Sequence, residues 1–297
     1  MAGVIGLTGV LQLIEPGLHF VATPIGTADD ITLRALRVLK EADVIAAEDT
    51  RRTRHLMEIH AVPLGGRKLV AYHDHNGAKM RPRLLQDLKE GRSVAYASDA
   101  GTPLVADPGL KLAQAAIELD LPVISVPGPS AVLAALTVAG LPTDQFYFAG
   151  FLPAKAGARH RQLDALATLP ATQVLFEAPQ RIKTLLAEVA RSHGADRPMA
   201  LCRELTKKFE TVLRGNVAEV SEALTQAPKG ELVLVLGGAP NAAWSQEQID
   251  QSLLQMLKDH SVKDAVNLVC ETSGAPRKTV YARALALKSD PSDADEF

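Results

Sequence analysis

Three short loops carry residue types that could hold a small ligand. Residues 22–27 read ATPIGT, residues 98–109 read SDAGTPLVADPG and residues 127–130 read PGPS, and each follows a short apolar run. Glycine permits backbone conformations closed to other residues, whereas proline fixes φ and removes an amide donor. Such loops are stiff, and their remaining N–H groups are open to close approach by a ligand. Ordinary strand-to-helix turns have the same composition, so both interpretations remain open.

Two details of these loops bear on the kind of ligand. The first loop lacks the pattern G-x-G-x-x-G, so a dinucleotide fingerprint is absent. The third loop opens an Ala-rich helical segment at 131–139, whose N-terminal amides and Ser130 hydroxyl could hold an anion or a carboxylate. Capping of that helix alone would explain Ser130 equally well.

Basic residues form a second set of candidates. Three groups could contact phosphate: Arg51, Arg52 and Arg54; Lys155, Arg159, His160 and Arg161; and Arg203, Lys207 and Lys208. Each group alone is more often a solvated surface, and the first, which follows Glu48 and Asp49, also fits a helix start with local ion pairs. Their position beside the candidate loops favours contact with RNA, although a net charge of −2 argues against a generally basic nucleic-acid binder.

The segment HDHN at 73–76 could suggest a metal site. Its two histidines alternate across an extended chain, and no further His or Cys cluster completes a ligand set. We therefore expect no bound metal.

The order of elements predicts how these segments are positioned. Apolar runs at 18–22, 44–47, 69–72, 94–97 and 123–126 alternate with helical patterns, which predicts a mainly parallel sheet covered by helices. The alternation resumes with runs at 146–149, 174–176, 199–202 and 232–236 and with helix candidates near 158–168, 180–192 and 216–226, which predicts a second α/β unit. From 245 to 288 only helical periodicity is present, with Ser261 and Asp264 spaced as a capping box.

Composition is that of a soluble globular protein. The 297 residues suffice for about two domains, and 47% of them are hydrophobic and 22% charged. The two cysteines, Cys202 and Cys270, are distant in sequence, which favours buried thiols in a reducing compartment over a disulfide. No apolar run approaches the roughly 18 residues of a membrane span. The apolar start lacks a preceding Lys or Arg, so we interpret it as an extension and not as a signal peptide.

The set of loops, in this order, resembles the tetrapyrrole-methylase superfamily and, within it, the 16S ribosomal RNA cytidine 2′-O-methyltransferase subfamily. The resemblance covers roughly residues 18–288 and rests on PIG at 24–26, AEDTR at 47–51, HDHN at 73–76, SDAGTP at 98–103, DPG at 107–109, PGPS at 127–130, GFLP at 150–153, RELTK at 203–207 and KGE at 229–231.

This resemblance implies a two-domain α/β methyltransferase that is not of the Rossmann type. It would bind S-adenosyl-L-methionine in the cleft between the domains, act in the cytoplasm as a homodimer, and use neither membrane nor metal. Its expected parts are an N-terminal extension at 1–17, an N-terminal α/β domain at 18–127, a C-terminal α/β domain at 128–242, a helical C-terminal domain at 243–288 and a disordered acidic tail at 289–297.

The resemblance also places the cofactor. The residues carried over to it are Pro24, Ser98, Asp99, Ala100, Gly101, Thr102, Pro103, Pro127, Gly128, Pro129, Ser130, Phe176 and Ala200. The second domain would contribute around Phe176 and Glu177, at Ala200 and at the strand after Lys229. Ligands of open α/β sheets bind beyond the carboxyl ends of the strands, which is where the loops of the first sheet are expected.

The expected reaction, methyl transfer from a sulfonium to a ribose hydroxyl, is an in-line displacement. Alignment and exclusion of water should supply most of the rate, and a base would help because a 2′-hydroxyl is a weak acid. Candidates for that base are Asp99, Glu48, Asp49, His73, Asp74 and Glu204, and Asp99 could equally bind the methionine amino group or order its turn. The catalytic set we retain is Asp99, Glu48, Glu204 and Lys207, the last of which could lower the pKa of the hydroxyl electrostatically. The RNA-binding candidates are Arg51, Arg52, Arg54, His73, His75, Arg159, Arg161, Arg203 and Lys207.

Three functions remain in competition at this stage. The subfamily implies methylation of cytidine 1402 (rRNA numbering) in 16S rRNA, with 16S rRNA or the 30S subunit as partner. A methylase of a uroporphyrinogen or precorrin is the alternative, and its polycarboxylate substrate would also suit basic residues. A non-catalytic DNA- or ribosome-binding protein is the third, because helical segments near 263–272 and 277–288 have the lengths of a helix-turn-helix, with Arg277, Lys278, Arg283 and Lys288 as candidate contacts.

Overall fold

A computed structural model describes residues 14–73, 75–106, 108–226, 228–240 and 244–289. The chain forms two compact units: residues up to 162 together with 172–237 form the first, and residues 163–171 together with those from 238 onward form the second. Asp74, Asp107, most of the expected N-terminal extension and the expected tail from 290 lie outside the described residues.

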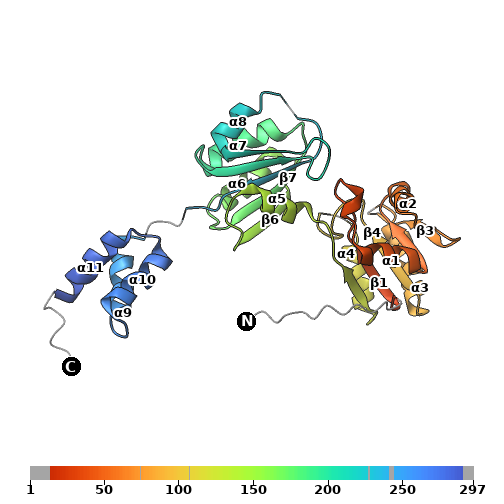
Figure 1. Ribbon diagram of the computed structural model, residues 1–297, viewed down its shortest axis with the longest axis horizontal. Helices are drawn as coiled ribbons and strands as arrows, with labels where there is room; N and C mark the ends of the chain where they lie inside the picture. The colour runs from red at the N-terminus through yellow and green to blue at the C-terminus, as the bar shows by residue number, and fades with distance from the viewer. Residues whose placement is uncertain (1–13, 74, 107, 227, 241–243, 290–297) are drawn as a thin grey trace. The chain divides into compact units, whose positions relative to one another are not determined.

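The first unit contains a five-stranded sheet in which every strand pair is parallel (Figure 1). Its strands lie in the order β3-β2-β4-β1-β5. Their bounds are β1 Gly17–Val21, β2 Val44–Ala47, β3 Lys68–Ala71, β4 Ser93–Ala97 and β5 Val123–Val126. The parallel sheet predicted from the sequence is therefore confirmed, with each boundary within one residue of the apolar run that indicated it.

Helices cover both faces of this sheet, which explains why its strands read as continuous apolar runs. Alternate residues of β1 illustrate the division: Leu18 and Phe20 join the core formed with α3 (Gly77–Lys89) and α4 (Leu110–Ile117). Val21 joins the opposite core, formed with α1 (Leu33–Glu41) and α2 (Thr50–Ile59). A short 3-10 helix, η1 (Ala28–Asp30), precedes α1.

A second five-stranded sheet follows in the order β6-β7-β10-β8-β9. Its strands are β6 Phe146–Phe151, β7 Thr172–Glu177, β8 Pro198–Arg203, β9 Thr211–Asn216 and β10 Leu232–Leu236. Only β6 and β7 run parallel, while β10 is antiparallel to both β7 and β8, and β9 is antiparallel to β8. The sequence prediction missed β9, because TVLRGN lies at a half-exposed sheet edge and lacks an apolar run.

Four helices belong to this half of the chain: α5 Ala131–Ala139, α6 Ala156–Leu166, α7 Ile182–His193 and α8 Val217–Ala223. Helix α5 packs its apolar face on β8, β9 and β10. It begins at Ser130, whose side chain accepts a hydrogen bond from the Leu133 amide and caps the helix. Cys202 lies in this core, where burial raises the pKa of its thiol to about 11.

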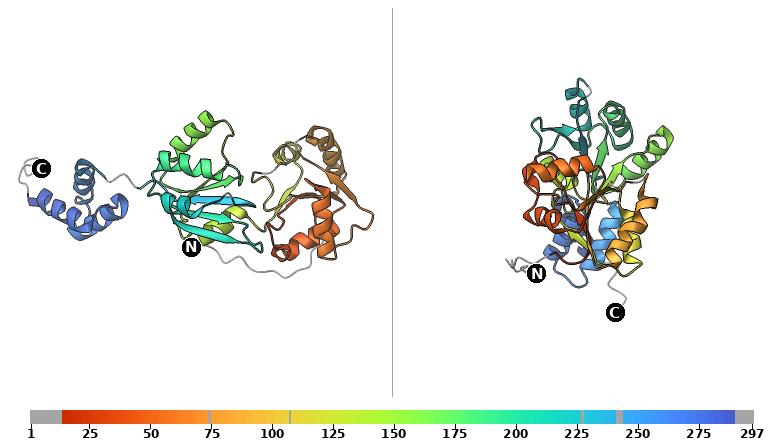
Figure 2. Two further views of the ribbon diagram at one scale, coloured as in Figure 1. Left: turned by 90° about the horizontal axis from the view of Figure 1, so that it is seen from above. Right: turned by 90° about the vertical axis from the view of Figure 1, so that its right-hand side faces the viewer.

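The second unit contains α9 (Gln246–Met256), α10 (Val262–Ser273) and α11 (Arg277–Ser289), which pack on one another around their own apolar core (Figure 2). Ser245 and Gln248 form a reciprocal capping box at the start of α9. At the predicted box, Ser261 caps α10 by accepting from the Asp264 amide, while its hydroxyl donates to the Asp264 carboxylate. None of the described helices is long and apolar enough to cross a lipid bilayer.

Candidate functional site

The strand order brings the three ligand-binding candidate loops together. Because β1 lies between β4 and β5, the loops that leave the carboxyl ends of these strands emerge side by side at one edge of the sheet. Thr23 and Gly101 exchange two backbone hydrogen bonds, of 3.0 and 2.9 Å. The Thr102 hydroxyl donates to the Pro129 carbonyl at 3.0 Å, so the second loop is fixed to both of its neighbours.

These loops form one wall of a cavity of about 350 Å³ in the first unit. The other wall comes from the end of β6, the end of β7 and the start of β10. Of the predicted cofactor residues, those that line the cavity are Ala100, Gly101, Thr102, Ser130 and Phe176. The volume lies within the range typical of small-molecule sites.

The other predicted cofactor residues lie elsewhere. Pro24, Ser98 and Asp99 line a smaller neighbouring cavity of about 180 Å³. The loops after β1 and β4 therefore each border both cavities. Ala200 is fully buried in the core under α5, and the residues that support the loops without lining either cavity are Pro103, Pro127, Gly128 and Pro129. Gly128 allows close packing, since an added Cβ would lie 3.1 Å from the Cβ of Ala22.

Backbone amides of the second loop are available on the cavity wall. The amides of Ala100 and Thr102 donate to none of the described residues, whereas the Gly101 amide is used in the bridge to Thr23. The expectation of free N–H groups in this loop therefore holds for Ala100 and Thr102 and is wrong for Gly101. Facing walls carry apolar side chains, among them Phe151 and Phe176, whose rings meet edge to face at 5.5 Å.

One acidic side chain in the cavity wall has an unpaired oxygen. Glu177, at the end of β7, is 3% exposed. Its Oε1 accepts hydrogen bonds from the Ala178 amide and Arg181 Nε, both at 2.7 Å. Its Oε2 is buried and has no hydrogen-bond partner among the described residues. A buried acceptor of this kind is costly unless a ligand donates to it, so the cavity fits a ligand with a polar N–H or O–H group on this side.

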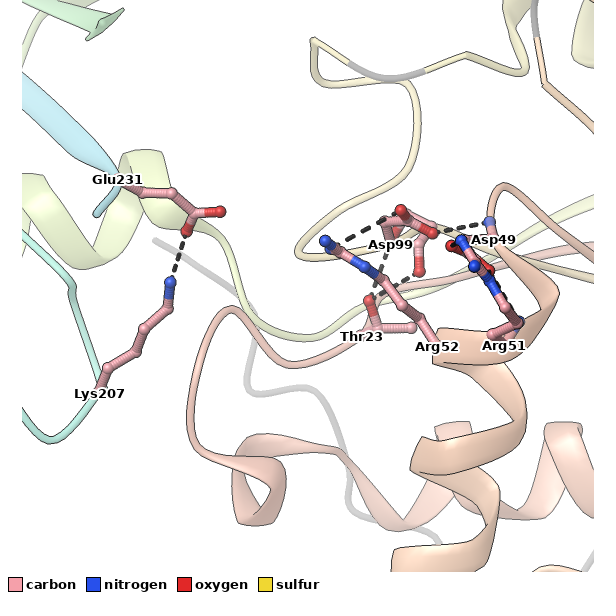
Figure 3. A network of polar contacts seen from close by, with 8 residues as sticks. Thr23, Asp49, Arg51, Arg52, Asp99, Lys207 and Glu231 are labelled. Carbon is pink, nitrogen blue, oxygen red and sulfur yellow. Dashed lines mark hydrogen bonds and ion pairs between the residues drawn. The ribbon is translucent and has the colours of Figure 1, made fainter. Parts of the chain in front are cut away.

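A second carboxylate at the cavity, that of Glu231, leads to the RELTK segment. Lys207 Nζ lies 2.9 Å from the Glu231 carboxylate (Figure 3). It also lies 3.0 Å from the Glu204 carboxylate. Burial alone would lower the pKa of Lys207, but its hydrogen bonds with the two carboxylates outweigh burial and raise it. The pKa of Glu204 is lowered, first by the Glu231 amide, which donates to it at 2.9 Å, and then by Lys207.

Glycine is required at Gly230, beside this network. Its φ is +96°, and an added Cβ would lie 2.4 Å from Glu204 Cδ. Gly26 is similarly close, because a Cβ there would lie 2.5 Å from Lys207 Cγ. The Thr27 amide donates to Thr206 Oγ1 at 3.1 Å, so the RELTK segment contacts the loop after β1.

Asp99 lies in a second polar network, at the start of α2 (Figure 3). Its Oδ1 accepts from the Asp49 amide at 2.8 Å, and its Oδ2 lies 3.7 Å from Arg52. Asp49 caps α2 and pairs with Arg51, whose side-chain hydrogen bonds hold the pKa of Asp49 well below its ordinary value. Glu48 lies between β2 and this helix and is half-buried. The local ion pairs expected at this helix start are present.

The predicted RNA-binding residues differ in how far their side-chain donors are already used in hydrogen bonds within the protein. The Arg159 guanidinium is buried and bonds to Glu188 and to two backbone carbonyls, while Arg203 donates to the carbonyls of Lys229 and Phe209. The side chains of Arg54, His75 and Arg161 are exposed, that of His73 is half-buried, and Arg51 and Arg52 remain largely exposed despite their acidic partners. The described residues contain no cluster of His, Cys, Asp and Glu that could hold a metal ion.

Comparison with known families agrees with this geometry. A profile described as Tetrapyrrole (Corrin/Porphyrin) Methylases matches residues 17–221, which include the whole first sheet and every strand of the second sheet except β10. The chain belongs to the tetrapyrrole methylase family. A second profile, described as RsmI C-terminal HTH domain, matches residues 243–288. The fold expected from the sequence motifs, with two α/β parts of the tetrapyrrole-methylase type and C-terminal helices, is thereby confirmed.

Relatives of this tetrapyrrole methylase family member align along nearly the whole chain. Ribosomal RNA small subunit methyltransferase I of Mesorhizobium japonicum is 43% identical over 284 residues, which cover 95% of this chain and 96% of the relative. The protein of the same name from Pseudomonas aeruginosa is 40% identical over 275 residues, covering 90% and 96%.

Solved structures share the fold of this methylase. Uroporphyrin-III-C-methyltransferase from Thermus thermophilus is 25% identical with a TM-score of 0.54, and the match covers 75% of this chain and 94% of that chain. Diphthine synthase is 18% identical with a TM-score of 0.59, covering 74% and 89%. A further Thermus thermophilus uroporphyrin-III C-methyltransferase structure, 22% identical with a TM-score of 0.52 and covering 74% and 96%, is a complex with S-adenyl homocysteine.

Two residues of the site are absent from the chosen cofactor set, although the resemblance pointed close to both. It expected contributions around Phe176 and Glu177 and at the strand after Lys229, and Glu231 lies within the KGE motif. Neither has a sequence signal of its own that distinguishes a cavity-facing carboxylate from an exposed one. Only the packing of β7 beside β10 places both in one wall.

Proposed function

We propose that this chain uses S-adenosyl-L-methionine to methylate the ribose 2′-oxygen of cytidine 1402 (rRNA numbering) in 16S rRNA of the small ribosomal subunit. Relatives at about 40% identity along the whole length bear the name of ribosomal RNA small subunit methyltransferase I, which supports the rRNA substrate. The observation that carries the cofactor is the cavity between the SDAGTP loop and Glu177. Its free amides, apolar walls and unpaired carboxylate oxygen match a ligand that combines an apolar ring with several polar donors.

The chain's own residues would bind and align the reactants. The bound cofactor supplies a methyl group on a sulfonium. The amides of Ala100 and Thr102 and the Glu177 carboxylate are placed to orient the cofactor, and Phe151 and Phe176 to exclude water from its apolar part. Alignment of this kind accounts for most of the rate expected of a methyl transfer to a hydroxyl.

The four catalytic candidates divide into two groups by charge and position. With its raised pKa, Lys207 is an ammonium at neutral pH, so we assign it an electrostatic role and not that of a base. Glu204 positions Lys207 through the 3.0 Å contact. Asp99 and Glu48 lie at the carboxyl end of the first sheet, and Asp99 borders the smaller cavity, which places it to accept the proton of a hydroxyl bound there.

RNA would contact the exposed basic residues of both units. Arg51, Arg52 and Arg54 lie on the first turns of α2 beside the smaller cavity. In the helical unit, Arg277 and Lys278 begin α11 and Lys288 lies in its last turn, whereas Arg283 is paired with Asp250 and is removed from our set of contacts. We also remove Arg159, since its donors are satisfied internally.

The remaining organisation is proposed with the function. We retain the domain boundaries after residues 17, 127, 242 and 288, action in the cytoplasm, and a homodimer. The homodimer rests on the resemblance to the subfamily.

One experiment separates the rRNA substrate from the tetrapyrrole alternative. Purified protein and labelled S-adenosyl-L-methionine are incubated with small ribosomal subunits that lack the modification, with naked 16S rRNA, and with uroporphyrinogen. We expect label in the RNA of at least one ribosomal sample and none in uroporphyrinogen. Label in uroporphyrinogen alone would refute the rRNA substrate, and failure to bind the cofactor would refute the methyltransferase function.

A further inference from the structure

A third cavity, of about 410 Å³, lies at the far end of the SDAGTPLVADPG loop. Residues 100–102, 105 and 106 of this loop line the proposed cofactor cavity, and Pro108 and Gly109 line the third cavity, so one loop contributes to both walls. The remaining lining residues come from the end of β3, the first two turns of α3 and the start of α4.

The floor of the third cavity is rigid. Tyr72 is 3% exposed, and its ring meets Tyr96 edge to face at 5.8 Å. The Tyr96 hydroxyl donates to the Pro108 carbonyl at 3.0 Å, which fixes the loop. Gly109 has φ of +121°, and an added Cβ would lie 2.9 Å from Leu104 Cδ2, so the loop can take this path only with glycine.

Among the described residues that line this cavity, the polar side chains other than that of Tyr72 are basic. His73, Arg81 and Lys111 contribute to its wall, and none of them forms an ion pair with any described carboxylate. His73 Nδ1 and Arg81 Nε are buried atoms without a hydrogen-bond partner among the described residues. This differs from Arg51, Arg159 and Arg203, whose donors are occupied.

Two helix N-termini add to the positive potential. Gly77 and Ala78, in the first turn of the 13-residue α3, line the cavity, as do Leu110 and Lys111 at the start of α4. A helix N-terminus carries about half a positive charge and unpaired amides, which favours an anion nearby. Basic side chains and helix ends therefore favour the same kind of ligand.

We propose that this cavity binds a backbone phosphate of the RNA substrate, beside the nucleotide that is methylated. The inference rests on the proposed function, which requires RNA to reach the cofactor cavity at the other end of the same loop. Arg81 can present two parallel donors to a phosphate, and Lys111 supplies a second charge at the rim. A phosphate fixed here would limit how the neighbouring ribose can enter.

The test compares the double variant Arg81→Ala/Lys111→Ala with Arg83→Ala, a matched control on the exposed side of α3 that does not line the cavity. Affinity for a fluorescent RNA fragment containing the target cytidine is measured by anisotropy at several salt concentrations. We expect the double variant to bind RNA about 10- to 50-fold more weakly, with a salt slope smaller by about one to two. Cofactor affinity, measured by calorimetry, and melting temperature should match those of Arg83→Ala.

The outcomes separate this inference from the proposed function. If the unmodified protein binds and methylates the RNA while the double variant retains full RNA affinity and salt slope, the inference is wrong and the function stands. If the unmodified protein methylates no RNA, the function itself fails. Inorganic phosphate serves as a further probe. If phosphate raises the melting temperature of the unmodified protein in the absence of RNA, while the double variant binds RNA with unchanged affinity, the cavity is a site for free phosphate. That result would also overturn the inference.

Discussion

The Glu177 carboxylate has two oxygens in different situations. Oε1 is satisfied by Ala178 and Arg181, whereas Oε2 is buried at the cofactor cavity without a partner among the described residues. Arg181 pairs with this carboxylate, and Oε2 is left as one unsatisfied acceptor. A hydrogen bond from a bound cofactor would remove that cost.

Replacing this carboxylate should weaken cofactor binding selectively. We expect Glu177→Gln to weaken binding of S-adenosyl-L-methionine by about 10- to 100-fold, because the amide keeps one acceptor for Ala178 and presents a donor where an acceptor is needed. Calorimetric titration measures the dissociation constant.

A matched control for this variant is Glu188→Gln. Glu188 is also a largely buried carboxylate, with its side chain 11% exposed, and it pairs with an arginine, Arg159, but it does not line the cavity. Both variants should lose stability, and only Glu177→Gln should lose cofactor affinity. Equal affinities of the two variants would show that Glu177 has a structural role alone.

At this scale the sequence predicted loops better than individual contacts. Ala100, Gly101, Thr102, Ser130 and Phe176 line the cavity because a local motif specifies where a loop approaches a ligand. Ala200 does not line it, since a strand residue faces the ligand or the core according to the register of the sheet, which local sequence does not specify. Ion pairs such as that of Arg159 with Glu188 connect residues that are 29 positions apart, and the sequence alone does not predict them either.

Among the elements, the order of strands decides which loops meet. The sequence predicted β1, β2 and β4 because strands buried on both faces are continuous apolar runs, and it predicted the partly buried edge strands β3 and β5 from shorter runs rich in Val, Ile and Leu. Their order, which places β1 between β4 and β5, depends on long-range packing and is not readable from those runs. The edge strand β9 was missed because half of its surface is exposed and its pattern is mixed.

The turn before β10 shows how an element supports the site. Gly230 leaves room for Glu204, which in turn holds Lys207 beside Glu231. Gly230→Ala should destabilise the fold by about 2 kcal/mol, through the clash and the left-handed backbone, and should reduce methyl transfer more than cofactor binding. Thermal melting and single-turnover rates measure the two effects.

The control for this substitution separates the cost of a positive φ from the cost of the contact between the added Cβ and Glu204. Gly65 also has a positive φ, of +60°, but no atom lies within 4 Å of an added Cβ. Gly65→Ala should therefore cost about 1 kcal/mol and leave the rate of methyl transfer unchanged. A normal rate in Gly230→Ala would argue against any role of the Glu204 and Lys207 pair.

For the whole molecule, carboxylates with lowered pKa values link stability to pH in both units. The pKa of Asp43 is lowered chiefly by hydrogen bonds from Ser93, that of Glu188 by Arg159, and that of Asp250 by Arg283. Each group is ionised more readily in the folded state than in the unfolded state. Its contribution is therefore fully present above its ordinary pKa and is lost as the pH falls through the lowered folded value.

Acid should accordingly unfold the protein over a defined range. We expect the melting temperature to fall between about pH 5 and pH 3, and Glu188→Gln to be less stable than the unmodified protein at pH 7 by about 2 kcal/mol. The difference should shrink toward pH 3, since protonation removes the same charge from the unmodified protein. A difference that stays constant across this range would show that Arg159 does not stabilise the ionised form of Glu188.

The central claim is that the methyl group is transferred to a ribose oxygen of one cytidine. The measurement that tests it most directly is alkaline hydrolysis of the RNA labelled by the purified protein, followed by mass spectrometry of the fragments. A 2′-O-methyl group blocks cleavage at its own phosphodiester, so we predict that the label appears in a single alkali-resistant dinucleotide that begins with cytidine. Label on a base, released as an ordinary mononucleotide, would contradict the account.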